Sequence, residues 1–481
     1  MSNSRVRQKV LRKTKVIATV GPACDSVETL TAMIRAGMNV ARLNFSHGSH
    51  DQHRERIERI RRIAQAESAN VGIMLDTRGV EIRTGRVEGG AVQIATGSTL
   101  RLTTDGRLGN AEAVAISHTG LPAAVAEGAA ILVDDGAIEL RAREVSEHEI
   151  RCDVIRGGRL GDRKGVNLPD TVLTLESMTA ENRDDLRFAI ENRATYLAVS
   201  FVRNAGDVAW IQRFLAGEGA SIPIIAKIET RSGVDNLAEI VAVADGTMVA
   251  RGDLGVEIPL EQVPLIQKRV IRTTVGSGKP VITATQMLDS MERSPRPTRA
   301  EVSDVANAIL DGTSAVMLSG ETAAGAYPVQ AVETMARLAL EAEASLAEFG
   351  ALQHIAPEPS NVVTEAVSQA AITMANHLQA AAMIALSETG FTARSISKYR
   401  PRCPILAVTV SPDVVARLSM NWGVTALLFE GMRSDEAMLR FALARGRALG
   451  CLTGGDVVVA IAGIDRKTGS TDTIRVLRVV D

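Results

Sequence analysis

The sequence predicts an α/β protein built on a (β/α)8 TIM barrel, with an inserted small β-barrel lid domain and a C-terminal open α/β domain. Eight short apolar runs alternate with amphipathic helical stretches, and eight parallel strands are the number that closes such a barrel. Polar residues directly follow nearly every run, at the end where barrels of this kind carry their chemistry. The periodicity also changes twice along the chain, which predicts the two additional domains.

The barrel is expected to occupy residues 1–77 and 165–347. Its predicted strands are Val16–Val20, Val40–Leu43, Gly72–Leu75, Tyr196–Val199, Ile224–Ile228, Thr247–Ala250, Pro280–Ala284 and Ala315–Leu318. Helical patterns between them lie at Ser26–Ala36, His50–Ala66, Ala180–Asn192, Asn236–Ala244, Leu260–Ser277 and Arg299–Leu310. The polar strand ends are Asn44, Ser46, Asp76, Thr77, Ser200, Lys227, Glu229, Arg251, Asp253, Thr285, Gln286, Ser319 and Glu321.

Residues 78–164 interrupt this alternation between the third and fourth predicted strands. Short β-like stretches lie at Val92–Ile94, Thr99–Leu102, Ala130–Val133, Ile138–Arg143 and Glu149–Ile155. An insertion at the mouth of a barrel is where a mobile cap would sit. Residues 348–481 follow a composition change at a loop with two prolines, and helices and strands alternate in them again.

Bulk composition excludes several classes of protein. A net charge of −2 and 3% aromatic residues argue against nucleic-acid binding. We expect no membrane association, because no apolar run approaches the roughly 20 residues that span a bilayer. The cysteines are scattered without metal spacing and are expected to be reduced thiols of a cytoplasmic protein: Cys24, Cys152, Cys403 and Cys451.

Lys227, Glu229 and Asp253 form the central predicted cluster. Lys227 and Glu229 lie two residues apart and so face the same side of a strand, while Asp253 follows the next strand. Two carboxylates beside a lysine are suited to Mg²⁺ or Mn²⁺. The alternative is a buried ion pair between Lys227 and Glu229.

Two further stretches supply groups suited to phosphate and to a monovalent cation. Arg42 and Arg83 carry guanidinium groups of the kind that bind phosphate. Asn44, Ser46, Asp76 and Thr77 offer oxygens with a single formal charge, which suits a monovalent cation better than a divalent one. His47 is more often a structural hydrogen-bonding residue than a base. Together these groups predict phosphoryl transfer without a P-loop or a kinase-type glycine-rich loop.

Long blocks of the sequence closely resemble the pyruvate kinase family, in the family's order and over essentially the whole chain. They are KVIATVGPA (Lys15–Ala23), VARLNFSHG (Val40–Gly48), DTRGVEIRTG (Asp76–Gly85), KGVNLP (Lys164–Pro169), AKIET (Ala226–Thr230), MVARGDLGVEIP (Met248–Pro259), ATQMLDSM (Ala284–Met291), residues Pro297–Val332 and SKYRPRCPILAVT (Ser397–Thr409). The resemblance implies phosphoryl transfer from phosphoenolpyruvate to ADP, with pyruvate and ATP as products.

The resemblance also implies a role for each site residue. Glu229 and Asp253 would hold Mg²⁺ (or Mn²⁺), and Lys227 and Arg42 would contact the phosphoryl group. Gly252 and its neighbours would offer backbone N–H groups to the substrate carboxylate. Thr285 would lie at the methylene face of the enolate, with Ser319 in a proton relay. The K⁺ ligands would be Asn44, Ser46, Asp76 and Thr77, and the nucleotide-binding residues Asn44, Arg83 and Lys164.

Four positions bear on how far the resemblance extends. Arg78 and Val80 stand where the family commonly has Lys and Pro, so we expect an altered lid hinge. Glu81 beside Thr77 resembles the potassium-dependent branch. In the C-terminal domain, a loop that resembles an effector phosphate site carries Phe391 where many relatives have Arg.

Residues Ser387, Thr389, Gly390 and Thr392, opposed by Lys467, Thr468, Gly469 and Ser470, could bind a sugar phosphate or AMP; ordinary loop capping is the alternative. A homotetramer is expected by resemblance. Two other functions remain open at this stage. One is a Mg²⁺-dependent carbon–carbon lyase acting on a pyruvate-like substrate, and the other is a non-catalytic metabolite sensor.

Overall fold

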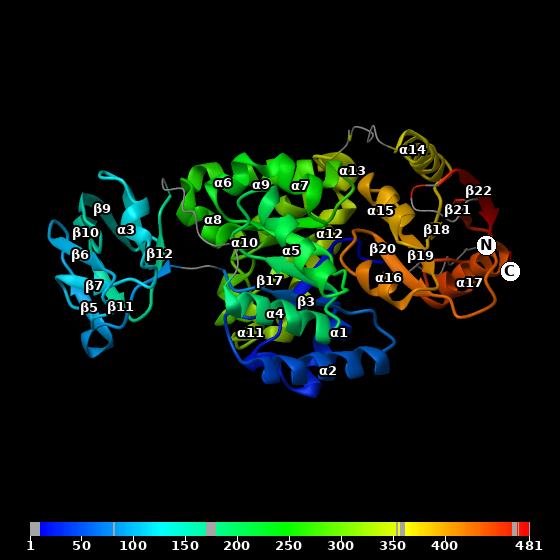
Figure 1. The fold of residues 1–481 in the computed structure, drawn as a ribbon. Coiled ribbons are helices and arrows are strands. Elements are labelled where there is room, and N and C mark those ends of the chain that lie inside the picture. Colours follow the sequence, from blue (N-terminus) through cyan, green and yellow to red (C-terminus); the bar gives the residue numbers. More distant parts are fainter. Residues whose placement is uncertain are drawn as a thin grey trace.

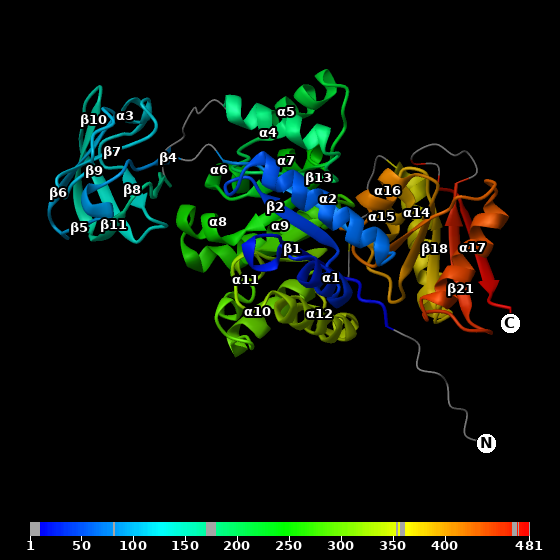
Figure 2. The same cartoon turned by 90° about the horizontal axis from the view of Figure 1, so that it is seen from below.

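The computed structural model describes residues 10–79, 82–169, 179–352, 355, 361–463, 469 and 471–480. The chain forms a closed barrel that lies between a small β domain and a C-terminal α/β domain (Figures 1 and 2). The barrel sheet has the order β1-β17-β16-β15-β14-β13-β3-β2, and every neighbouring pair is parallel. The predicted (β/α)8 barrel is confirmed.

The eight barrel strands coincide with the predicted apolar runs to within one residue at most ends. They are β1 (Lys15–Thr19), β2 (Val40–Asn44), β3 (Gly72–Asp76), β13 (Tyr196–Val199), β14 (Ile224–Ile228), β15 (Gly246–Ala250), β16 (Val281–Ala284) and β17 (Ala315–Leu318). Their side chains are almost completely buried because the outer face packs on helices and the inner face fills the barrel.

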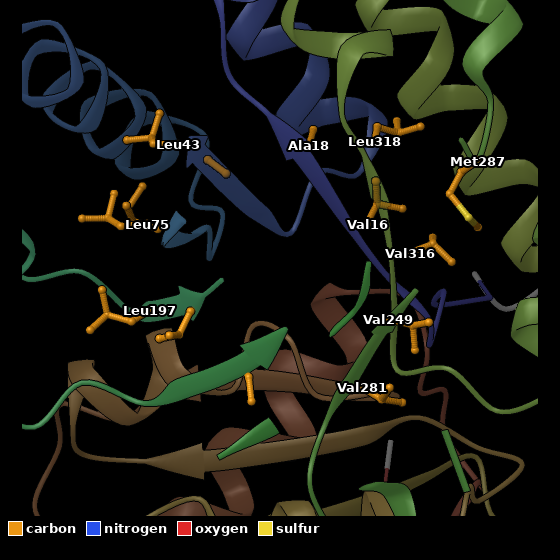
Figure 3. Packing of buried hydrophobic residues seen from close by; sticks show 14 of the residues in the cluster. Val16, Ala18, Leu43, Leu75, Leu197, Val249, Val281, Met287, Val316 and Leu318 are labelled. Atoms are coloured by element: carbon orange, nitrogen blue, oxygen red, sulfur yellow. The ribbon is translucent and has the colours of Figure 1, made fainter. Parts of the chain in front are cut away.

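Helices cover the outside of the barrel. They are α1 (Val27–Ala36), α2 (His50–Ala66), α4 (Ala180–Glu191), α5 (Ala205–Gly217), α6 (Arg231–Asp235), α7 (Leu237–Val243), α8 (Arg251–Glu257), α9 (Val263–Gly276), α10 (Arg299–Leu310), α11 (Gly320–Ala323), α12 (Pro328–Ala344) and α13 (Leu346–Phe349). Helix α10 begins with a capping box between Thr298 and Glu301, and Ser26 caps α1. Apolar side chains from strands and helices interdigitate in the layer between them, among them Val16, Leu43 and Leu318 (Figure 3).

The inserted domain is a curled sheet of seven strands with the order β4-β12-β8-β9-β10-β6-β7, accompanied by the pair β11-β5. Its strands are β4 (Ile82–Arg83), β5 (Ala91–Ile94), β6 (Thr99–Thr103), β7 (Ala113–Ala115), β8 (Ala130–Val133), β9 (Ile138–Val145), β10 (Glu149–Arg156), β11 (Gly158–Gly161) and β12 (Gly165–Asn167). A bridge between Thr84 and Ile116 joins the two edges of the large sheet, so the sheet closes as the predicted small β-barrel.

Strand β12 pairs with β4 and β8 inside this domain. The lid therefore extends at least to Asn167, three residues beyond its predicted end at residue 164. The other predicted domain limits stay predictions.

The C-terminal domain is an open sheet with the order β20-β19-β18-β21-β22, parallel except for β22. Its strands are β18 (Ala382–Leu386), β19 (Ile405–Thr409), β20 (Val424–Leu428), β21 (Val457–Ala462) and β22 (Thr473–Arg478). Helices α14 (Val362–His377), α15 (Phe391–Lys398), α16 (Pro412–Arg417) and α17 (Asp435–Ala448) flank the sheet. No helix in the described part of the chain is long and apolar enough to cross a membrane.

The C-terminal domain contributes to the interior of the barrel. Met420, between α16 and β20, is 0% exposed and belongs to the cluster of inward-facing barrel residues that includes Ile17, Met74 and Met248. The Tyr196 hydroxyl donates a hydrogen bond to the carbonyl of Arg417 at 2.6 Å. These contacts lie at the amino ends of the barrel strands, opposite the predicted active-site rim.

Candidate active site

The predicted site residues of the barrel lie at the carboxyl ends of its strands. Lys227 is in β14, with Glu229 just after it, and Asp253 is in the first turn of α8, after β15. Asp76 ends β3, and its partner across the strand pair is Asn44 at the end of β2. Asp76 and Lys227, which are 151 positions apart in the sequence, thereby meet at one edge of the barrel.

Lys227 is the hub of this edge. Its ammonium Nζ lies 2.7 Å from Ser200 Oγ, 2.8 Å from Glu229 Oε1 and 3.2 Å from Asp76 Oδ1. Burial opposes its charge, but the carboxylates of Asp76 and Glu229 outweigh burial and raise the pKa of Lys227. The side chain is therefore a fixed positive charge aimed at the rim.

Arg42 is a second cation held next to Lys227. Its Nε donates to Asp76 Oδ2 at 2.7 Å, and its Nη1 donates to Thr19 Oγ1 at 3.0 Å. Asp76 is 1% exposed; burial alone would raise its pKa, yet Lys227 and Arg42 hold the pKa of Asp76 below its ordinary value. One buried carboxylate thus orients two cations toward the same space.

Glu229 has the properties of an incomplete metal ligand. The side chain is 0% exposed, and neither carboxylate oxygen accepts a hydrogen bond, although Oε1 forms the ion pair with Lys227. Burial raises the pKa of Glu229 to about 7; Lys227 opposes this shift and the nearby charge of Asp253 adds to it. Buried carboxylate oxygens without donors are costly unless a cation or a proton joins them.

The donor set fits a divalent cation that takes few ligands from protein. Among the described residues, no group of three or more His, Cys, Asp or Glu side chains could hold a metal ion. Glu229 and Asp253 are two carboxylates, so the remaining positions would go to water and substrate oxygens. Mg²⁺ commonly binds in this way, through one or two carboxylates plus substrate.

The residues expected to bind K⁺ lie around the ends of β2 and β3. Asn44 Oδ1 accepts the backbone N–H of Ser46 at 3.1 Å, and Ser46 is exposed on the following turn. The Thr77 carbonyl accepts Ser200 Oγ at 2.8 Å. These oxygens carry one formal charge, on Asp76, which is the chemistry of a monovalent site. The side chain of His47 is exposed, and its backbone carbonyl accepts a hydrogen bond from the His53 ring.

Thr285 directly follows β16, and Ser319 directly follows β17. Thr285 Oγ1 accepts the backbone N–H of Gly252 at 2.8 Å. The backbone N–H of Gly252 therefore points at the hydroxyl oxygen of Thr285. The backbone N–H of Ser319 donates to Glu321 Oε2 at 2.7 Å, and Glu321 also accepts the N–H of Leu288. Glu321 caps backbone groups here, so this polar strand end is structural.

The nucleotide-binding candidates of the lid lie together but away from the rim. Arg83 in β4 pairs with Gly165 in β12, next to Lys164. Lys164 Nζ forms an ion pair with Asp134 at 2.9 Å. Figures 1 and 2 show the lid to one side of the barrel and set apart from it. Asn167, at the end of β12, donates to Glu257 of α8 at 3.3 Å.

The lid hinge begins at Arg78 and Gly79. Arg78 contacts Asp185 of α4 at 3.4 Å, and its carbonyl accepts Asn182 Nδ2 at 2.8 Å. The hinge is thus anchored to α4, the helix that follows the second lid connection. The other hinge departure from the family pattern, Val80, lies outside the described residues, as does Glu81.

The predicted effector loop lines a pocket of the C-terminal domain. Ser387, Thr389, Thr392 and Gly469 contribute to its wall, together with Phe391, Arg433 and Thr471. Gly390, with φ +79°, caps helix α15, and Arg433 forms an ion pair with Glu388 at this pocket. Lys467, Thr468 and Ser470 lie outside the described residues.

Two residues of the rim had no predicted role. Thr19 ends β1 and orients Arg42, and Ser200 directly follows β13 and contacts Lys227. The signal used for the other strands, a polar residue after an apolar run, does not mark Thr19, because Thr19 lies inside the predicted run Val16–Val20. Ser200 carried this signal, but its partner Lys227 is apparent only once β13 and β14 are paired.

Barrel, lid and a rim of paired cations and buried carboxylates define this chain as a phosphotransferase. The family described as "Pyruvate kinase, barrel domain" matches residues 11–332, and the family described as "Pyruvate kinase, alpha/beta domain" matches residues 365–477. The chain belongs to the pyruvate kinase family, which excludes the carbon–carbon lyase alternative.

Individual relatives support the family assignment. A pyruvate kinase of Bacillus licheniformis is 46% identical over 474 residues, which are 98% of this chain and 81% of that protein. A pyruvate kinase of Staphylococcus aureus (strain bovine RF122 / ET3-1) is 45% identical over 474 residues, 98% of this chain and 80% of that protein. The crystal structure of a pyruvate kinase from Cryptosporidium parvum has a TM-score of 0.90 at 40% identity and covers 97% of this chain and 96% of that one.

Proposed function

We propose that the chain transfers the phosphoryl group of phosphoenolpyruvate to ADP, giving pyruvate and ATP, with Mg²⁺ (or Mn²⁺) and K⁺ bound. The observation that carries this proposal is the hub at Lys227, where one ammonium contacts Ser200, Asp76 and Glu229 at the barrel rim. The family assignment supports the two substrates.

Lys227 and Arg42 would neutralise the phosphoryl group while it moves between the two substrate oxygens. Both are held by Asp76, so neither pays a large ordering cost when substrate arrives. As phosphorus leaves, the substrate oxygen becomes an enolate, whose charge Lys227 would oppose. Protonation of the methylene carbon then gives pyruvate; Thr285 would border this face and Ser319 would belong to the proton relay.

Glu229 and Asp253 would hold the divalent cation, because Glu229 is fully buried and its Oε2 has no hydrogen-bond partner, while its Oε1 contacts Lys227. When bound there, Mg²⁺ would polarise the substrate carboxylate and enolate oxygens. The monovalent ion would bind among Asn44, Ser46, Asp76 and Thr77. Arg83 and Lys164 would reach the nucleotide phosphates when the lid closes, with Asn44 at the barrel side.

The proposal extends to an effector site, an assembly and a cellular role. The pocket at Ser387, Thr389 and Thr392 would bind an effector such as a sugar phosphate or AMP, with Arg433 available to its phosphate once Glu388 is displaced. The assembly would be a homotetramer, by resemblance. The enzyme would act in glycolysis in the cytoplasm, where its four buried, free cysteines stay reduced.

The function is tested by following pyruvate formation from phosphoenolpyruvate and ADP while Mg²⁺, K⁺ or ADP is omitted in turn. Each omission should abolish or sharply lower turnover. Full turnover in a buffer free of K⁺ and Na⁺ would contradict the monovalent site. Turnover without ADP would contradict phosphoryl transfer.

The metal site is tested separately with Glu229→Gln. The variant should lose nearly all of its rate, and Mn²⁺ binding measured by electron paramagnetic resonance should weaken in parallel. Glu67→Gln, a partly exposed carboxylate paired with Arg35 far from the rim, is the matched control. Unchanged Mn²⁺ affinity in Glu229→Gln would overturn the metal assignment.

A further inference from the structure

The turn that carries Thr285 has a strained backbone. Thr285 and Gln286 follow β16 with φ angles of +68° and +52°. Residues other than glycine rarely adopt this left-handed conformation, and for β-branched threonine it is a true outlier. Such backbone geometry persists only where the surroundings hold it.

Arg251 supplies that hold from the neighbouring strand end. Its Nη2 donates to the carbonyl of Thr285 at 2.6 Å and lies 3.4 Å from that of Gln286, while its Nε donates to the carbonyl of Ala284 at 3.2 Å. One guanidinium group thus contacts the carbonyl oxygens of three successive residues at the strained turn. Only the planar fork of arginine presents donors in this arrangement.

The guanidinium is itself anchored from the opposite side. Arg251 Nη1 donates to Asp304 of α10 at 2.7 Å and lies 3.5 Å from Gln267 Oε1 of α9. The Arg251 side chain is 12% exposed. Two helices therefore fix the arginine, and the arginine fixes the turn.

The residue after Arg251 holds the side chain of the same threonine. The Gly252 N–H donates to Thr285 Oγ1, whose own proton points to the carbonyl of Ala284 at 2.6 Å. Arg251 thus holds the backbone of Thr285, and Gly252 holds its hydroxyl group. Both residues lie at the start of α8, the helix that carries Asp253.

We propose that Arg251 is a positioning residue that locks Thr285 against the helix of the proposed metal ligand Asp253. The inference rests on the proposed function, in which Thr285 borders the methylene carbon of the enolate. In that step the carbon–carbon π pair takes a proton from solvent through the relay, and an oxygen lone pair closes the carbonyl. Displacing Thr285 should impair this step without weakening nucleotide binding.

The test compares Arg251→Lys, Thr285→Ala and the double variant in the metal-loaded full-length enzyme. Pyruvate formation gives kcat and KM, and deuterium uptake into the pyruvate methyl group in D₂O, followed by NMR, reports the protonation step in reverse. Arg251→Lys should lower kcat and methyl exchange roughly tenfold or more, the scale of one lost charge-assisted hydrogen bond. The KM for ADP should change less than about threefold.

The double variant should be no slower than Thr285→Ala, because both changes remove the same feature. Multiplicative losses would overturn the proposal. Arg35→Lys is the matched control and should leave both rates unchanged, because Arg35 is an exposed residue of α1 that pairs with Glu67 at the end of α2.

Amide hydrogen exchange over residues 284–288 separates this proposal from the proposed role of Thr285. Exchange should accelerate in Arg251→Lys, because the strained turn loses its carbonyl partners. Unchanged exchange overturns the lock even if activity falls. If Thr285→Ala keeps full methyl exchange while the turn in Arg251→Lys loosens, the lock stands and the proposed role of Thr285 fails.

Discussion

At the scale of single residues, Asp76 organises the rim. It is nearly inaccessible to solvent, and both of its oxygens contact cations that would meet the transferred phosphoryl group. The two cations keep the carboxylate of Asp76 ionised, and Asp76 in turn orients both cations. A carboxylate placed in this way is a positioning group rather than a base.

We predict that Asp76→Asn keeps the fold but loses the orientation of Arg42 and Lys227. Asparagine retains the shape of the side chain while its amide nitrogen faces a cation, so two charge-assisted contacts are lost. kcat/KM for phosphoenolpyruvate should fall roughly 100-fold, as measured by initial rates. Asp105→Asn, in an exposed lid ion pair with Arg107, is the control. A fall of less than about threefold in Asp76→Asn would contradict this role.

Glu229 should make the stability of the metal-free protein depend on pH. An unfolded glutamate titrates near about 4.3, whereas the folded pKa of Glu229 is about 7. Between these values the folded state binds more protons than the unfolded state, so stability falls as pH rises through this window.

Urea unfolding with a chelator present, at about pH 5 and about pH 8, measures this difference. Glu229→Gln should show a smaller loss of stability over the same interval than the unchanged protein. Equal losses in both proteins would show that Glu229 titrates at its ordinary value.

At the scale of elements, the sequence was sufficient to predict those helices and strands whose physical signals are local. The eight barrel strands are continuous apolar runs because both of their faces are buried. Helices α2 and α10 were predicted to the residue from their amphipathic patterns. Strands β4 and β12 were missed because two or three residues show no periodicity. Their pairing depends on the lid closing around them.

The site was predictable to the same extent. Lys227 and Glu229 share a strand, so their common face follows from the period of two. The contact of Lys227 with Ser200 and Asp76 needs the strand order β14-β13-β3, which no local pattern contains. The lock at Arg251 likewise depends on the backbone conformation of Thr285, and threonine at φ +68° has no sequence signature.

The lid hinge offers a prediction at this scale. A Cβ atom at Gly79 would collide with the ring of Phe201, which itself has φ +54°. Gly79→Ala must therefore displace the ring or the hinge, at a cost of about 1–3 kcal/mol in unfolding free energy, and it should raise the KM for ADP by misdirecting the lid.

Denaturant unfolding and steady-state kinetics measure both effects. Phe201→Ala in the Gly79→Ala background should recover part of each loss, because the smaller side chain makes room for the added methyl group. Gly217→Ala is the control, since a Cβ atom there meets no neighbour within 4 Å. If Gly79→Ala behaves like this control, the hinge is not packed as described.

At the scale of the whole molecule, the interior of the barrel is completed by a residue of the C-terminal domain. Met420 of the C-terminal domain occupies the inner core at the amino ends of the strands, and a Cβ at Gly72 would collide with Ser419 beside it. Met420 N–H also donates to the Tyr196 hydroxyl at 3.3 Å. Tyr196 begins the strand that ends at Ser200, so the same element contacts the C-terminal domain at one end and Lys227 at the other.

Met420→Ala should therefore destabilise the barrel, although the residue belongs to the C-terminal domain. Removing a fully buried methionine side chain costs about 2–5 kcal/mol, and the cavity would lie among Ile17, Met74 and Met248.

The chain has two tryptophans, Trp210 on barrel helix α5 and Trp422 beside Met420. In a Trp422→Phe background, Trp210 fluorescence reports the barrel alone, and its urea midpoint should fall in Met420→Ala. Met374→Ala, partly exposed on α14, is the control. An unchanged Trp210 midpoint would mean that the barrel is stable without this side chain, and the C-terminal domain would then be a neighbour of the barrel core rather than a part of it.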